Sequence, residues 1–223
     1  QQGGGVGCDF STLRPSGTPA LSVGVTASGP VSFMQIWDTM CSTILSTGAR
    51  RGAMMATLRC DHPDIEEFVH VKKNATKLRH FNLSVLISDA FMQAVQDDAD
   101  WPLVFPLGAH DVVATDKTVD RVWPGSMTPV RCRVLRTVPA RHLWDQILQA
   151  NYDYAEPGVI FVDRMNALNN LWYAEQIGAT NPCGEIPLPP YGACNLGSIN
   201  LTQFVHAPFS EKASLDLAAI ADT

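Results

Sequence analysis

Residues 179–200 read ATNPCGEIPLPPYGACNLGSIN and combine three kinds of reactive side chain within a short distance. Asn181, Cys183 and Glu185 place an amide, a thiol and a carboxylate on alternate positions, and Cys194 adds a second thiol. Side chains alternate between the two sides of an extended chain, so the spacing predicts that the first three face one cavity. An amide, a thiol and a carboxylate in one cavity favour a catalytic site.

The neighbours of Cys183 argue against a packing role. A free cysteine is most often an inert core residue. Here Pro182 favours an extended conformation before the thiol, and Gly184 lets the chain turn closely around it. An unpaired carboxylate such as that of Glu185 is costly to bury, so packing does not explain its place beside a structural thiol. We therefore interpret this cysteine as functional.

The hydrophobic pattern along the rest of the chain predicts helices that alternate with strands. Each predicted helix has apolar residues at three-to-four spacing. The helices follow SGPVS (with Phe33, Ile36, Trp37, Met40 and Ile44), cover HPDIEEFVHVK (Ile65, Phe68, Val69), follow Ser88 (Phe91, Met92, Val95) and follow Pro139 (Leu143, Trp144, Ile147, Leu148); the strands are RRGAMMATLR, FNLSVLIS and GVIFVD. Strands separated by helices predict an α/β fold with parallel strands, as a sheet or a barrel. Residues 107–129 look like a loop or an insertion, and no linker clearly divides the chain into two domains.

The composition limits the possible functions. The chain has 16 basic and 22 acidic residues and a net charge of -6, which argues against a general nucleic-acid or membrane-surface binder. No stretch is long and apolar enough for a membrane span, and the first residues do not resemble a signal peptide, so we expect a cytoplasmic protein. The six cysteines are scattered without a CxxC pair, which predicts reduced thiols and no zinc site. The chain begins without Met, and we interpret it as a fragment.

Two further segments are compatible with ligand binding. Glycines 3, 4, 5 and 7 match neither a dinucleotide fingerprint nor a P-loop, and they indicate either a close backbone approach to a ligand or a simple turn. A basic cluster follows a predicted helix end and favours either a solvated helix terminus or an anion-binding loop. Its members are Lys72, Lys73, Lys77, Arg79 and His80.

The segment NPCGEIPLPPYGACNLGSINL resembles the active-site loop of ribonucleotide reductases, and it is most similar to the adenosylcobalamin-dependent class, where a short Pro-rich stretch separates the two cysteines. The resemblance extends along essentially the whole chain in five ordered blocks. These are QQGGGVGCDFSTLRP, SGPVSFM, GARRGAMMATLRCDHPDIEEF, LRHFNLSVLISDAFM and AEPGVIFVDRMNALNN.

The resemblance implies a fold and a chemistry. The fold is a ten-stranded α/β barrel of two parallel halves with the cysteine loop through its centre, and residues 1–223 are part of this catalytic barrel domain. Adenosylcobalamin generates a radical that passes to Cys183, Glu185 acts as the base on the ribose 3′ hydroxyl, and Asn181 orients the ribose hydroxyls. Cys194 is one member of the cysteine pair that supplies the two electrons, and its partner lies upstream of the glycine-rich block. Cys8, Cys41, Cys60 and Cys132 are then structural or incidental.

The resemblance also implies binding regions and partners. Gly4, Gly5, Ser28, Gly29, Asn181, Pro182 and Gly184 would line the ribonucleotide substrate. Residues 73–79, the effector loop, would bind a deoxynucleotide effector through Lys73, Lys77 and Arg79, with Arg14, Arg50 and Arg51 as candidates for its phosphates. The expected partners are thioredoxin or glutaredoxin as reductant and a second subunit in a possible homodimer.

Two other functions stay open, the large subunit of a metal-radical reductase and a noncatalytic nucleotide-binding fragment. The choice between diphosphate and triphosphate substrates, the effector ranking and the oligomeric state are also open.

Overall fold

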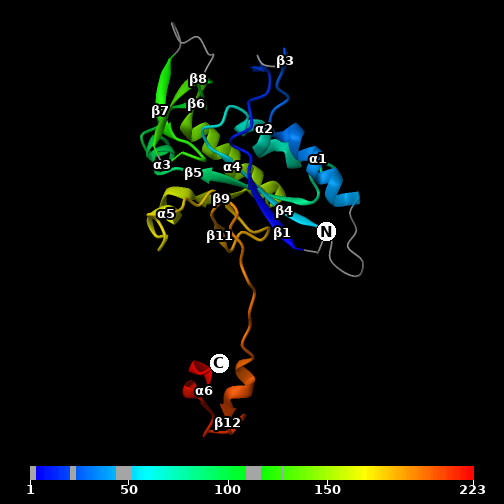
Figure 1. Cartoon of the computed structure of the whole chain (residues 1–223), viewed down its shortest axis with the longest axis vertical. Helices are drawn as coiled ribbons and strands as arrows, with labels where there is room; N and C mark the ends of the chain where they lie inside the picture. The colour runs from blue at the N-terminus through cyan, green and yellow to red at the C-terminus, as the bar shows by residue number, and fades with distance from the viewer. Residues whose placement is uncertain (1–3, 21–23, 44–51, 109–116, 127) are drawn as a thin grey trace. The chain divides into compact units, whose positions relative to one another are not determined.

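The computed structural model describes residues 4–20, 24–43, 52–108, 117–126 and 128–223 (Figure 1). These residues form two compact units, Gln1–Gly192 and Ala193–Thr223. The first unit contains the expected α/β structure, and the second is small.

A parallel sheet forms the centre of the first unit. Its strands are β1 (Gly5–Asp9), β4 (Ala53–Arg59), β5 (Phe81–Ile87) and β9 (Gly158–Phe161), in the order β1-β4-β5-β9. Every neighbouring pair is parallel. The three strands expected from the sequence are therefore confirmed as β4, β5 and β9, and the glycine-rich segment supplies a fourth.

Four helices, α1 to α4, lie between these strands in the chain as the apolar spacing predicted, and a fifth, α5, follows β9 and was not predicted. They are α1 (Pro30–Thr43), α2 (Ile65–His70) with the 3-10 turn η1 (Val71–Lys73), α3 (Asp89–Gln96), α4 (Ala140–Tyr154) and α5 (Val162–Ala167). Ser88 is the N-cap of α3, where its side chain accepts a hydrogen bond from the backbone N–H of Phe91 at 3.2 Å. This confirms the helix start expected at that serine.

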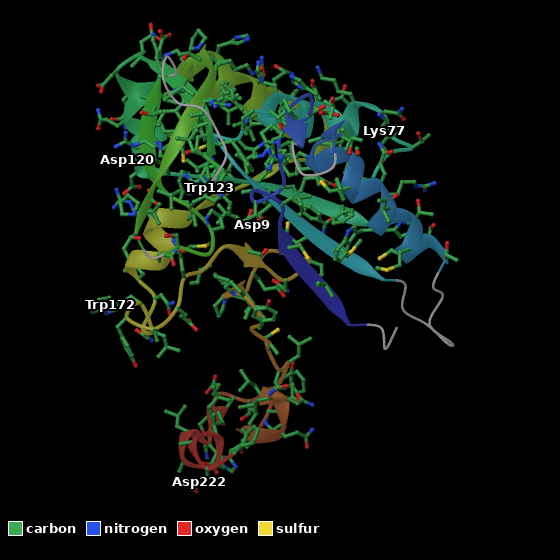
Figure 2. All side chains as sticks on the ribbon, turned by 45° about the horizontal axis from the view of Figure 1, so that its top comes forward. Asp9, Lys77, Asp120, Trp123, Trp172 and Asp222 are labelled. Carbon is green, nitrogen blue, oxygen red and sulfur yellow. The ribbon has the colours of Figure 1, made fainter. Side chains whose placement is uncertain are left out.

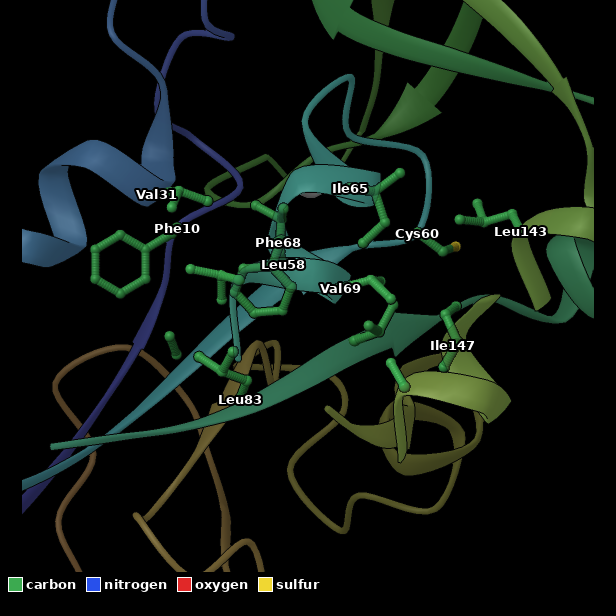
Figure 3. Close-up of a cluster of buried hydrophobic side chains, with 14 of the residues drawn as sticks. Phe10, Val31, Leu58, Cys60, Ile65, Phe68, Val69, Leu83, Leu143 and Ile147 are labelled. Carbon is green, nitrogen blue, oxygen red and sulfur yellow. The ribbon is translucent and has the colours of Figure 1, made fainter. Parts of the chain in front are cut away.

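The main hydrophobic core lies between one face of the sheet and the helices (Figure 3). Along β4, Met54, Ala56 and Leu58 belong to this core, so Met55 and Thr57 point to the opposite face of the sheet. Phe81, Leu83, Val85 and Ile87 do the same on β5. The sheet thus has a core face and a second face, and the second face carries the candidate site.

Parts of two predicted apolar stripes are exposed. On α1 the buried side chains include Val31, Met34 and Cys41, whereas Phe33, Ile36, Trp37 and Met40 are at least 39% exposed. On α4 Leu143 and Ile147 are buried as expected, but Leu148 is 48% exposed. On each of these helices the apolar side chains extend beyond the face that packs on the sheet. The apolar spacing alone therefore did not show which of them are buried. Ile44 lies outside the described residues.

A second sheet corrects the expectation of a loop over residues 107–129. Strands β6 (Asp100–Pro106), β7 (Thr118–Val122) and β8 (Pro129–Pro139) form an antiparallel sheet in the order β6-β8-β7. Its small core contains Val104, Trp123 and Cys132. The strand β7 was missed because three of its five residues are polar and it lies at the edge of the sheet.

The remaining elements are short. Strands β2 (Pro19–Ala20) and β3 (Val25–Thr26) form a hairpin in the first unit, and the second unit consists of η2 (Leu201–Phe204), β12 (Val205–His206), β13 (Ser214–Leu215) and α6 (Leu217–Ala221). Across the described ranges, the helices are too short or too polar to cross a membrane.

Candidate active site

A tight hairpin carries Asn181, Cys183 and Glu185. Strands β10 (Ala179–Thr180) and β11 (Pro187–Leu188) are antiparallel, and residues 181–186 connect them. The N–H of Gly184 donates to the carbonyl of Asn181 at 3.0 Å, and the N–H of Ile186 donates to Asn181 Oδ1, also at 3.0 Å. The expected extended backbone is therefore wrong, because these bonds and the positive φ of +88° at Gly184 close a turn. That the three side chains share one cavity stays a prediction.

The side chains of the hairpin differ in their exposure to solvent. Cys183 and Glu185 are exposed, Asn181 is partly buried, and Pro182 is buried. The side chain of Asn181 uses its carbonyl oxygen to close the turn, which leaves its amide nitrogen for a ligand. Cys194 is also exposed and lies in the second unit.

Two glycines of β1 let the hairpin lie directly on the second face of the sheet, opposite helices α1, α2 and α4 (Figure 1). A Cβ atom on Gly7 would lie 1.7 Å from the carbonyl oxygen of Thr180, and one on Gly5 would lie 2.3 Å from Cγ of Pro182. Any side chain at either position would push the hairpin away from the sheet. The sequence suggested that these glycines approach a ligand, but Gly5 and Gly7 approach the hairpin itself.

Two polar side chains of the sheet donate hydrogen bonds that hold the hairpin against it, and neither was predicted from the sequence. Thr57 on β4 donates from Oγ1 to the carbonyl of Gly178 at 2.9 Å. Asn82 on β5 donates from Nδ2 to the carbonyl of Pro182 at 2.7 Å. The available signal was alternation, since both are polar residues on the non-core face of otherwise apolar strands.

A buried carboxyl lies where β1 ends, beside the segment that leads into the hairpin (Figure 2). Asp9 Oδ1 accepts a hydrogen bond from the N–H of Ser11 at 2.9 Å, while Oδ2 is buried without a partner. Burial raises the pKa of Asp9 to about 6, although the hydrogen bonds from Ser11 and the charge of Arg59 oppose the shift. This carboxyl therefore ionises near neutral pH.

We expect the stability of the protein to depend on Asp9 between about pH 4 and pH 6. Because the folded pKa is raised, the native state binds the proton more tightly; this contribution is complete below about pH 4 and is lost as the pH rises through about 6. The shift of about two pKa units corresponds to at most about 3 kcal/mol. Asp9→Asn should therefore raise the free energy of unfolding more at pH 8 than at pH 4.5, and urea titration at the two pH values measures the difference. An equal effect of the substitution at both pH values would contradict this assignment.

The other four cysteines differ from Cys183 and Cys194 in their surroundings. Cys41, Cys60 and Cys132 are buried and Cys8 is partly buried. Burial raises the pKa of Cys60 to about 12 and that of Cys132 to about 11, and it also raises the pKa values of Cys8 and Cys41. A raised pKa reduces the thiolate fraction, which makes these thiols poor nucleophiles.

The effector loop has a fixed base and an exposed tip. Lys72 Nζ donates to the carbonyls of Leu78 and Phe81, each at 2.7 Å, and lies 3.5 Å from Glu156 Oε1. Leu78 is buried with a φ of +51°, so it anchors the end of the loop. Lys72 thus joins the two ends of the loop and is not itself a free cation.

The three predicted effector contacts are exposed, and two of them line a cavity. Lys73, Lys77 and Arg79 all reach solvent, and Lys77 is at the outer surface in Figure 2. Lys73 and Lys77 line a cavity of about 530 Å³ together with His70 and Asn74, whereas Arg79 is not among its lining residues. Glu66 and Glu67 also line this cavity, so it is not purely cationic.

The remaining predicted binding residues lie outside the hairpin. Gly29 precedes α1 with a φ of +83°, and a Cβ there would contact Asp64 and Ser16, so chain packing explains this glycine. Ser28 is exposed beside it. Gly4 has open space around its Cα, and Arg14 donates to the carbonyl of Pro19 at 2.9 Å.

Arg50 and Arg51 lie outside the described residues. Within the part of the chain that the structure describes, no three His, Cys, Asp or Glu side chains gather closely enough to hold a metal ion.

A known protein family matches the whole of this chain. The family model named "Ribonucleotide reductase, barrel domain" matches residues 1–223. The chain belongs to this family. The fold is therefore part of the ribonucleotide reductase barrel.

Individual relatives of this reductase domain agree with the family. The vitamin B12-dependent ribonucleoside-diphosphate reductase of Mycobacterium tuberculosis (strain CDC 1551 / Oshkosh) is 41% identical over 91% of this chain and 26% of its own length. The protein of the same name from Thermoplasma acidophilum is 40% identical over 92% of this chain and 24% of its own length. A ribonucleoside-diphosphate reductase subunit alpha from Chlamydia trachomatis is 26% identical over 91% of this chain and 20% of its own length. The chain spans about a quarter of the length of the relatives from Mycobacterium tuberculosis and Thermoplasma acidophilum.

Proposed function

We propose that this chain supplies the radical cysteine of a cobalamin-dependent enzyme that reduces ribonucleotides to 2′-deoxyribonucleotides. The observation that carries the proposal is the hairpin, where Cys183 is exposed beside Glu185 on a turn bonded to the sheet by Asn82. The names of the matched relatives support ribonucleotide reduction with vitamin B12. The product would supply DNA synthesis in the cytoplasm.

Each of the three polar side chains of the hairpin has a different role in the reaction at the ribose. Cys183, once oxidised to a thiyl radical, takes the hydrogen atom from C3′ and later returns it. Sulfur suits this step because its bond to hydrogen is similar in strength to the ribose C–H bond. Glu185 accepts the proton of the 3′ hydroxyl while water leaves from C2′. The Asn181 amide nitrogen donates a hydrogen bond to a ribose hydroxyl.

The cofactor requirement fits Cys183. Its side chain is exposed at the turn, so the sulfur is open to a reaction partner from outside this chain. When bound, adenosylcobalamin would supply the radical that removes the hydrogen atom of this thiol.

Reduction at C2′ needs two electrons. Two thiols become one disulfide and release two hydrogens, of which one leaves with the 2′ hydroxyl as water and the other takes its place on C2′. Cys194 is the proposed member of this pair because it is exposed, and its partner would be a cysteine outside this chain. Thioredoxin or glutaredoxin would then reduce the disulfide.

Regulation by a deoxynucleotide is proposed for the effector loop. The exposed Lys73 and Lys77 beside a cavity favour binding of an anion there, and Arg79 would contribute from outside the cavity. The anchored base of the loop would let its tip respond to the effector without loss of the fold. Assembly of the full-length protein as a homodimer is part of the same proposal.

The nearest second candidate is a reductase that takes its radical from a metal-containing subunit. The Chlamydia trachomatis relative is named as a subunit alpha, so a reductase of more than one subunit stays a candidate. The two are separated by adding either adenosylcobalamin or a metal-radical subunit to the full-length protein and following deoxynucleotide formation. We expect formation with the cobalamin alone. Product formation that needs the metal subunit and ignores the cobalamin would show that the class is wrong.

The same assay tests the general base. Glu185→Gln keeps the shape and the hydrogen-bonding capacity of the side chain but cannot accept the proton, so it should slow the chemical step by about 10²–10⁴-fold. Glu175→Gln is the matched control, since Glu175 accepts a hydrogen bond from Asn169 outside the hairpin. Normal turnover by Glu185→Gln would remove this residue from the mechanism.

A further inference from the structure

Asn82 is a polar side chain on the face of β5 that supports the hairpin. Its neighbours Phe81 and Leu83 belong to the main core, so alternation directs Asn82 to the opposite face. Its Nδ2 lies 2.7 Å from the carbonyl oxygen of Pro182, which is a strong distance for an amide donor. The bond joins residues that are 100 positions apart in the chain.

The accepting carbonyl is the one that precedes the thiol. The C=O of Pro182 belongs to the peptide group that continues into Cys183, so a bond to this oxygen sets the plane of that peptide. Pro182 has a fixed φ and no N–H, which leaves its carbonyl as the polar backbone group through which it can be held. The bond therefore restricts the rotation that would swing Cys183 across the sheet.

The other polar bonds of the hairpin serve different purposes. The bonds from Gly184 and Ile186 both end on Asn181, and they shape the turn without fixing it to the sheet. Thr57 fixes the first strand of the hairpin at Gly178, five residues before the thiol. Asn82 acts one residue before the thiol.

We propose that Asn82 is a positioning residue for Cys183. Its amide holds the Pro182–Cys183 peptide so that the sulfur stays at one place above the sheet, where it meets the substrate C3′–H. This role rests on the proposed function of Cys183 as the radical carrier. It adds a residue of β5 to the machinery of the reaction, although that residue does not touch the reacting atoms.

The test uses Asn82→Asp in the full-length reductase. The aspartate has nearly the same shape, but an ionised carboxylate cannot donate and repels the carbonyl of Pro182. Displacement of a reacting group by about 1 Å costs about 10²-fold, so kcat should fall by about that factor while KM for the nucleotide changes less than about threefold.

Asn151→Asp is the matched control. The Asn151 side chain also donates to a proline carbonyl, that of Pro157 at 3.0 Å, but it lies at the end of α4 away from the hairpin. The Asn151→Asp variant should keep kcat within about twofold of the unmodified protein. Should Asn82→Asp fold poorly, Asn82→Ala removes the donor without adding charge and is expected to lower kcat in the same direction.

A second measurement needs neither cofactor nor nucleotide. The rate at which iodoacetamide modifies Cys183 is followed by peptide mass spectrometry, with Cys194 of the same sample as internal reference. Asn82→Asp should change the Cys183 rate relative to Cys194 at least threefold, and Asn151→Asp should not.

Equal kcat for Asn82→Asp and Asn151→Asp, or an unchanged relative rate for Cys183, would overturn the proposal. Failure of the proposed function is distinguished from failure of this inference by Cys183→Ser. Activity retained by that variant would show that Cys183 does not carry the radical, whatever the result for Asn82.

Discussion

Cys183→Ser is expected to abolish deoxynucleotide formation completely, even in a single turnover. A serine hydroxyl holds its hydrogen much more strongly than a thiol does, so it cannot become the radical that takes hydrogen from C3′. The measurement mixes the full-length variant with nucleotide and adenosylcobalamin and follows deoxynucleotide and released base.

The control for this variant is Cys8→Ala. Cys8 is partly buried with a pKa that burial raises, and it lies outside the hairpin. We expect this control to retain activity within a few fold of the unmodified protein. Product from Cys183→Ser would show that another group carries the radical, and the proposed mechanism would then be wrong.

Gly7→Ala should also cause a large loss of activity, although it adds only one methyl group and Gly7 lies on β1, outside the hairpin that carries Cys183. That methyl would lie 1.7 Å from the carbonyl oxygen of Thr180, closer than any real contact allows. Backbone lies on both sides of the clash, so β10 must move away from β1 and carry Cys183 with it. Overpacking of this kind costs about 1–3 kcal/mol, and a shift of about 1 Å costs about 10²-fold in rate.

Steady-state kinetics measure this effect, and urea unfolding of the same protein separates it from loss of the fold. Gly197→Ala is the control because a Cβ at Gly197 meets no atom within 4 Å. We expect kcat for the control to equal that of the unmodified protein. A Gly7→Ala variant with normal kcat would mean that the hairpin does not rest on β1 in the working enzyme.

Local patterns predicted the secondary structure where each element has one clear apolar face. The helix after Ser88 was predicted from its cap and its apolar spacing, and both are present. Strand β7 was missed because Thr118–Val122 lies at a sheet edge, has three polar residues among its five, and has few of the signals of a buried strand. The exposure of Phe33 and Trp37 on α1 was also unpredictable, because spacing shows that a helix is amphipathic but does not show which part of a broad apolar surface meets a neighbour.

The sequence by itself determined the candidate site residues. Asn181, Cys183, Glu185 and Cys194 were proposed from residue type and order, since a thiol beside a carboxylate favours chemistry over packing as its explanation. Only the tertiary structure decided how the hairpin is held. Gly5 and Gly7 make room for it, and Thr57 and Asn82 bind it across separations of 121 and 100 residues along the chain. The physical reason is that such a contact depends on strand order and on which face of a sheet a side chain occupies, and neither is encoded within the short segment that carries the thiol.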